Sequence, residues 1–200
     1  MVNKVGLSNR RAKEGKIRKL GNKIIEAVYK PYSCPSDEVY FFPEYNGVKG
    51  YLGTQEIIFL GLNPSKGNFP SKADEFFYKQ LLENGFSNAH LTDLTKLKIY
   101  AKNLKEIREH IQENRHNQIN YLLEEIRIIE PKIIVLMGNE CKRLFEKCIK
   151  HKINDTQIAV YAVPHYFQRG TEVGKRKLKE FEEKIKNIRQ EFKNLNEKRD

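Results

Sequence analysis

Residues 56–64 of the chain are EIIFLGLNP, in which the apolar run from Ile57 to Leu60 leads directly into Gly61 and a polar turn. A strand with one face in water alternates apolar and polar residues, so a continuous apolar run is typical of a strand buried on both faces. Two later segments share this pattern, namely residues 132–137, KIIVLM, before Gly138, and residues 157–163, QIAVYAV, before Pro164. The sequence therefore predicts three buried strands, each ending at a turn.

Helical periodicity fills the segments around these strands. The expected helices cover residues 8–29, 72–83, 103–130 and 139–150, and a charged helix begins at about residue 171. Strands that alternate with helices predict an α/β fold with a parallel sheet covered on both sides. Residues 31–54 favour an ordered loop with a short hairpin at Asn46-Gly47, and residues 86–98, FSNAHLTDLTKLK, are expected to be irregular unless a short strand precedes their polar end.

The formal net charge of +11 lies mainly at the two ends of the chain. Residues 1–30 carry nine Lys and Arg against two acids, whereas residues 171–200 carry ten against seven. Such an excess favours a polyanionic partner, nucleic acid above all, because cations that contact phosphates release counterions. We expect the N-terminal helix to face phosphate through Arg10, Arg11, Lys13 and Lys16. The C-terminal segment interleaves acids and bases, which is equally typical of a solvated helix face.

Several functional classes lack their usual signals. The chain has three cysteines, Cys34, Cys141 and Cys148, without C-x-x-C spacing, so we expect no disulfide framework or structural zinc, and expect Cys141 and Cys148 to lie in the core. No apolar stretch approaches the roughly 20 residues of a membrane span, which favours a cytoplasmic protein without membrane contact. The P-loop, dinucleotide and zinc-deaminase motifs are absent. We expect a monomer without metal or cofactor.

Polar and aromatic residues follow the predicted strands, where parallel sheets carry their functional loops. In residues 61–70, GLNPSKGNFP, the amide of Asn63 can orient a water without carrying charge, and Phe69 offers a flat surface for a base. The alternative for this loop is a plain Gly/Asn/Pro turn. In residues 163–170, VPHYFQRG, His165 is the only histidine directly beyond a predicted core strand. Residues 91–96, LTDLTK, cluster hydroxyl, carboxylate and amine groups that suit a site wall or helix caps.

The order of these motifs resembles the uracil-DNA glycosylase superfamily, most closely its mismatch-specific uracil/thymine branch. The similar segments are Gly61-Leu62-Asn63-Pro64, matching that branch's Gly-(Ile/Met)-Asn-Pro-Gly with Ser65 at the last position, Asn68-Phe69-Pro70, the paired Phe76-Phe77, residues 91–96, residues 131–138, and Val163-Pro164-His165. The resemblance spans about residues 55–170. It implies a three-layer sandwich with a central, mainly parallel four-stranded sheet flanked by helices, here preceded by a basic helix. We expect that helix at residues 1–31 and a single α/β domain at residues 32–200.

The resemblance also implies an activity, the hydrolysis of the N-glycosidic bond of uracil, or a related deaminated or mismatched base, flipped out of DNA for base excision repair. Asn63 would position the attacking water, Phe69 would stack on the base, and His165 would contact the base or a flanking phosphate. The remaining implied roles are base binding by Gly61, Leu62 and Pro64, and DNA contact by Ser65, Lys66 and Arg169. Because the fastest branch has Asp where Asn63 stands, slower chemistry is implied.

Two other functions fit the same residues. A catalytically degenerate protein of this fold would only bind nucleic acid, and it is suggested by the absence of the family's usual Pro-Ser around His165. A hydrolase or transferase for free nucleosides is disfavoured by the basic N-terminal helix. The expected macromolecular partner is duplex DNA with a damaged or mismatched base, with single-stranded DNA as a further substrate.

Overall fold

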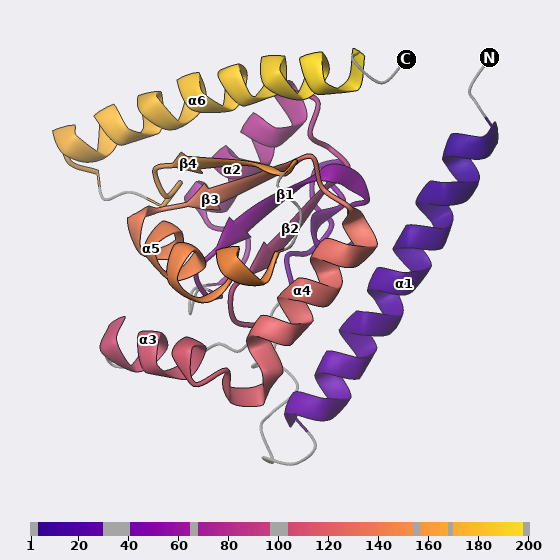
Figure 1. Cartoon of the computed structure of the whole chain (residues 1–200). Coiled ribbons are helices and arrows are strands. Elements are labelled where there is room, and N and C mark those ends of the chain that lie inside the picture. Colours follow the sequence, from indigo (N-terminus) through magenta and orange to yellow (C-terminus); the bar gives the residue numbers. More distant parts are fainter. Residues whose placement is uncertain are drawn as a thin grey trace.

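The computed structural model of this 200-residue chain describes residues 4–29, 41–64, 68–96, 104–153, 157–167 and 170–197. Figure 1 shows the elements of this part of the chain. In order they are α1 (Lys4–Tyr29), η2 (Gly50–Leu52), β1 (Gln55–Gly61), α2 (Lys72–Glu83), β2 (Ala89–Asp93), α3 (Leu104–Gln112), η3 (Arg115–Asn117), α4 (Gln118–Ile129), β3 (Ile133–Met137), α5 (Asn139–Cys148), η4 (Lys150–Lys152), β4 (Ala159–Val163) and α6 (Glu172–Glu197).

The four strands form one sheet of order β2-β1-β3-β4, in which every neighbouring pair is parallel. One face packs against α2 and α6, and the other against α3, α4 and α5, so the chain forms three layers (Figure 1). This arrangement confirms the predicted three-layer α/β sandwich. All carboxyl ends of the strands meet at one edge, on the left of Figure 1.

Strand β1 shows why a continuous apolar run marks the centre of such a sheet. Ile57 and Phe59 lie in the cluster shared with α2 and α6, whereas Ile58 and Leu60 lie in the cluster shared with α4 and α5. All four side chains are fully buried. Complete burial of such a side chain stabilises a fold by about 1.5–3 kcal/mol. A polar residue on either face of β1 would lose this stabilisation, which is why the strand is apolar throughout.

The helix α1 packs along α4 through Ile17, Leu20 and Ile24, all of which are buried. It begins at Lys4, four residues before the predicted start at residue 8. No helix in the described segments, including the long α1 and α6, is both long and apolar enough to span a membrane.

The single helix predicted over residues 103–130 is wrong. Asn114 and Asn117 adopt positive φ angles of 49° and 56°, which end α3 and start α4 in a new direction. Asn tolerates this left-handed conformation better than most residues. The side chain of Asn114 also accepts a hydrogen bond from the amide of Ile119 at 2.7 Å, so a local interaction replaces the helical one.

Three other local predictions have clear outcomes. The expected irregular stretch at residues 86–98 contains strand β2, the conditional alternative. The hairpin at Asn46-Gly47 is confirmed, since Tyr45 and Val48 exchange backbone hydrogen bonds of 3.0 and 2.9 Å across it. The buried thiols of Cys141 and Cys148 both lie in the core beside α4, as predicted. Cys34 lies outside the described residues.

Candidate active site

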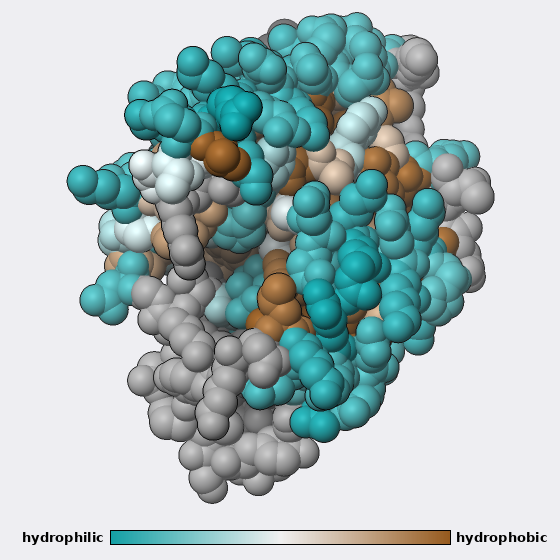
Figure 2. Space-filling model, turned by 90° about the vertical axis from the view of Figure 1, so that its left-hand side faces the viewer, coloured by the Kyte–Doolittle hydropathy of each residue, from teal (hydrophilic) through white to brown (hydrophobic). Residues whose placement is uncertain are grey.

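The sheet order places four chain segments side by side at the carboxyl edge. Across it, Asp93 ends β2, Gly61 ends β1, Gly138 follows β3, and His165 follows β4. Figure 2 views the molecule from the left-hand side of Figure 1, toward which the strands run, and shows a largely hydrophilic surface with separate hydrophobic patches among the described residues. The three predicted site loops therefore do meet at one edge of the fold.

The loop after β1 presents Asn63 as a half-buried amide. Its Nδ2 donates to the backbone carbonyl of Pro64 at 3.1 Å, which fixes the amide plane and leaves Oδ1 as an acceptor. Pro64 itself is buried and Leu62 packs against the core. Ser65 and Lys66, predicted to contact DNA, lie outside the described residues. An acceptor held at a strand end can orient a water.

The ring of Phe69 lies in an aromatic cluster that joins two distant segments. Its centroid is 5.3 Å from that of Tyr45 and 5.6 Å from that of Tyr78, both in edge-to-face geometry. Such ring pairs stabilise the fold by more than the burial of their apolar area alone. Phe69 is half-buried, so the cluster fixes the ring that we predicted to stack on a base. Tyr45 was not predicted as part of this wall, because its segment carried only turn signals.

His165 is held by ring stacking and by a backbone hydrogen bond. Its ring stacks on Tyr166 with centroids 4.7 Å apart, and Tyr166 stacks in turn on Phe77 at 4.4 Å. The amide of Phe167 donates to Nδ1 at 3.0 Å, so the proton of the neutral ring lies on Nε2. Burial lowers the pKa of His165, against the opposite effect of Asp74. His165 is therefore a neutral hydrogen-bond donor.

Gly138 lies beside His165 in a backbone conformation that favours glycine. It has a φ of +95°, and a Cβ at this position would lie 3.4 Å from the Cβ of His165. Its amide also donates to the carbonyl of Val163 at 2.8 Å, which ties the start of α5 to the end of β4. Arg169, the other residue predicted in this loop, lies outside the described residues.

Asp93 is a candidate that the sequence prediction did not single out. Its side chain is 4% exposed, and its Oδ1 lies 2.1 Å from where a Cβ on Gly61 would be, so only glycine leaves room for this carboxyl. Burial raises the pKa of Asp93 to about 7, with Lys96 lowering it and Glu125 raising it further. A carboxyl with such a pKa exchanges protons near neutrality, as a general base requires. It lies on the same face of the sheet as the aromatic cluster, because Leu91, two residues earlier, packs there.

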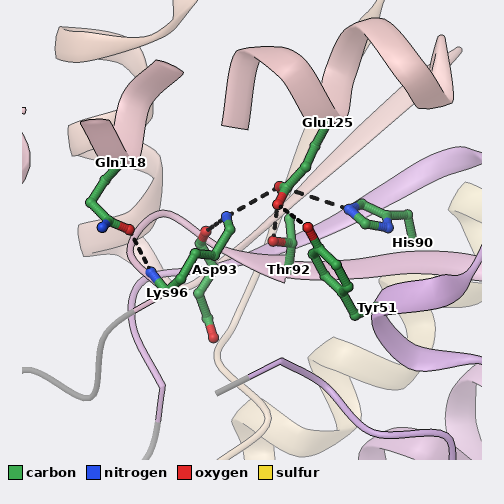
Figure 3. Close-up of polar contacts among 7 residues, drawn as sticks. All are labelled: Tyr51, His90, Thr92, Asp93, Lys96, Gln118 and Glu125. Carbon is green, nitrogen blue, oxygen red and sulfur yellow. Dashed lines mark hydrogen bonds and ion pairs between the residues drawn. The ribbon is translucent and has the colours of Figure 1, made fainter. Parts of the chain in front are cut away.

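The opposite face of β2 carries a buried polar network, which Figure 3 shows in close-up. Glu125 from α4 accepts hydrogen bonds from Tyr51 and Thr92, both at 3.0 Å, and from Lys96 at 3.1 Å. The Nε2 of His90 lies 3.7 Å from the same carboxylate. Burial raises the pKa of Glu125, but Lys96 and His90 lower it further than burial raises it, so Glu125 is ionised. Burial and Glu125 raise the pKa of Tyr51, which keeps its hydroxyl a donor.

The predicted phosphate-binding residues of α1 are not all alike. Lys13 is buried and its Nζ contacts the carbonyl of Ile129 and the carboxylate of Glu130, both at 2.9 Å, at the end of α4. Arg10 lines a cavity of about 360 Å³ beside Gln55 at the start of β1. Both therefore lie at the amino ends of the strands, away from Asn63 and His165. Arg11 and Lys16 are exposed. Lys13 thus anchors α1 to the end of α4.

A comparison with protein families gives one match. The family model of the uracil DNA glycosylase superfamily matches residues 50–191, which include all four strands and every described residue of the carboxyl edge. Helix α1 precedes the matched region. A search of curated proteins found no match. With most of the chain covered, and with the predicted fold present, the chain belongs to the uracil DNA glycosylase superfamily.

Proposed function

We propose that this protein is a monofunctional DNA glycosylase that hydrolyses the N-glycosidic bond of uracil, or of a related deaminated or mismatched base. The observation that carries the proposal is that one edge of the sheet carries an amide, a carboxyl with a pKa near 7 and a neutral imidazole, those of Asn63, Asp93 and His165. Membership of the superfamily supports it. The turn Gly61-Leu62-Asn63-Pro64 favours a relationship to the mismatch-specific branch.

In the proposed reaction, each of four side chains has a separate role. The target base leaves the duplex and stacks on Phe69. Oδ1 of Asn63 orients a water, whose oxygen bonds to the sugar carbon as the bond to the base breaks and its electrons pass to the base. Asp93 accepts the proton of the water. The Nε2 proton of His165 stabilises the negative charge that develops on the leaving base.

DNA contact is proposed to involve the loop after β4. Phe167 follows His165 and is 62% exposed, unusually much for a large apolar ring. An exposed ring beside the site can stack on a neighbouring base or fill the space that a flipped base leaves. The predicted backbone contacts of Ser65, Lys66 and Arg169 remain part of this proposal.

An oligonucleotide assay tests the function. Duplexes containing uracil, hypoxanthine or a thymine mismatch, and matching single strands, are incubated with the protein and treated with alkali to cleave abasic sites. We expect an abasic product from at least one substrate. Absence of product from all of them would contradict the glycosylase proposal, and salt-sensitive binding without product would favour the degenerate nucleic-acid-binding protein instead.

We also propose that the exposed cations of α1 contact DNA phosphates, on a surface apart from the carboxyl edge that carries Asn63 and His165. Replacing Arg10, Arg11 and Lys16 together with Ala is expected to flatten the plot of log binding constant against log salt, by about 0.9 for each phosphate that the variant no longer neutralises. Lys13→Ala is the matched control. It is expected to lower the free energy of unfolding by about 1–2 kcal/mol, because a buried charged hydrogen bond is removed, and to leave the salt slope unchanged. A slope that stays the same in the triple variant would show that α1 does not face phosphate.

A further inference from the structure

Lys96 and Glu125 form an ion pair that is withdrawn from water. The atoms Nζ and Oε2 are 3.1 Å apart, and the two side chains are 1% and 0% exposed. Burying two charges costs about as much as their attraction returns, and apolar residues of similar size often serve stability as well or better. Stability alone is therefore a weak reason for this pair.

The contacts of the pair converge on the residues that flank the carboxyl of Asp93. Nζ of Lys96 donates to the backbone carbonyl of Asp93 at 2.6 Å, and Glu125 accepts from the hydroxyl of Thr92 at 3.0 Å. Immediately beyond, the amide of Leu94 donates to the carbonyl of Gly61 at 2.9 Å. Figure 3 shows the pair on one side of β2 and the carboxyl of Asp93 pointing to the other.

The backbone of Lys96 is attached to α4 by a second contact. The backbone amide of Lys96 donates to Oε1 of Gln118 at 2.7 Å, and Gln118 is fully buried. The backbone from Thr92 to Lys96 is thus held by side chains of α4 on one face, while the other face carries the carboxyl at the proposed site. Movement of this backbone would move that carboxyl away from Gly61.

We propose that Lys96 and Glu125 are positioning residues for the proposed glycosylase reaction, since they fix the end of β2 so that the carboxyl of Asp93 stays against Gly61. This inference rests on the proposed function, in which Asp93 is the base. The two charges also act on that carboxyl in opposite directions, because Lys96 lowers and Glu125 raises the pKa of Asp93. From α5, Cys141 faces Asp93 as a neutral thiol, since burial raises its pKa and Asp93 raises it further.

The charge effect is tested by titrating the carboxyl carbon of Asp93 by NMR in three variants. In Lys96→Met the titration midpoint is expected to rise by about one pH unit, and in Glu125→Gln to fall by a similar amount. The double variant Lys96→Met/Glu125→Gln removes both charges of the pair, so neither partner is left buried without the other and the variant is expected to fold even if a single variant does not. Its titration midpoint for Asp93 is expected to lie between those of the two single variants. The low-pH limb of the single-turnover cleavage rate should move with each midpoint.

The positioning effect is tested by amide hydrogen exchange. The amides of Leu94 and Thr95 are expected to exchange at least tenfold faster in both variants that lack Lys96, because methionine cannot hold the carbonyl of Asp93. Lys132→Met is the matched control. Lys132 pairs with Glu56 at 3.1 Å with an 11% exposed side chain, but at the amino end of β3, so its loss should change neither readout.

Two results would overturn the inference. One is a midpoint of Asp93 that stays constant, or moves in the same direction, in the two single variants. The other is exchange at Leu94 and Thr95 that is no faster without Lys96 than in the Lys132→Met control. Neither measurement needs turnover, so a wild-type protein that cleaves no DNA would contradict the proposed function while the titration and exchange still decide the role of the pair.

Discussion

Asn63→Ala is expected to reduce the single-turnover rate of base removal by at least about 100-fold, because a water that is no longer oriented reaches the sugar carbon in an unproductive geometry. Duplex binding is expected to change by less than about twofold. The reason is that the Asn63 amide carries no charge, and phosphate contacts dominate affinity for DNA. The measurement compares cleavage under excess enzyme with binding of an uncleavable duplex.

A matched control for this variant lies in the same loop. Asn68 is exposed and five residues further along, so Asn68→Ala removes an amide without removing the one at the strand end. We expect it to retain the wild-type rate within a few-fold. Weakened binding with preserved turnover in Asn63→Ala, or equal effects of the two variants on turnover, would contradict the role of Asn63.

Much of the fold was predictable because its central strands are buried by apolar residues alone. The runs around Ile58 and Ile134 needed no partner from elsewhere to be recognised as strands. The third predicted run does form strand β4, but the prediction that it is buried is wrong, because β4 lies at the edge of the sheet and Val160 is 40% exposed. Strand β2 was less clear, since it buries His90 and Thr92 on one face. These polar groups are tolerated because Glu125 and Tyr51 meet them there. A sequence pattern does not show contacts between residues so far apart.

The same limit separates the predicted site residues from the missed ones. Asn63 and His165 follow recognisable apolar strands, so their place at the carboxyl edge could be predicted. Asp93 ends the strand that was uncertain, so its face and its proximity to Gly61 could not. Lys13 was expected to face phosphate because of its charge. A count of charges does not reveal that its ammonium contacts the carbonyl of Ile129 and the carboxylate of Glu130.

Asp93→Asn is expected to remove the proposed base and therefore to reduce the cleavage rate by about 10²–10⁴-fold. In the wild type, the rate should rise with pH and level off above the pKa of Asp93, about 7, because only the ionised carboxyl accepts a proton. The residual rate of the variant should lack this limb. A variant that keeps both the rate and the limb would contradict the role, whereas an altered choice of base would show that Asp93 contacts the base instead.

The same substitution is expected to stabilise the fold above neutrality, which distinguishes loss of function from loss of structure. Burial raises the pKa of Asp93 from an ordinary 3.8 to about 7, so between these values the folded state binds a proton that the unfolded state has released. Stability of the wild type therefore falls as pH rises through this window. Asparagine does not ionise, so the variant lacks this loss of stability. The loss is at most about 4 kcal/mol above pH 7 and is absent below about pH 4. Urea unfolding at pH 4 and pH 8 measures it. If the variant no longer cleaves DNA and its free energy of unfolding exceeds that of the wild type at pH 8 alone, the carboxyl of Asp93 is kept for its chemistry at a cost in stability. Equal free energies of unfolding of the two proteins at both pH values would contradict the raised pKa on which that role depends.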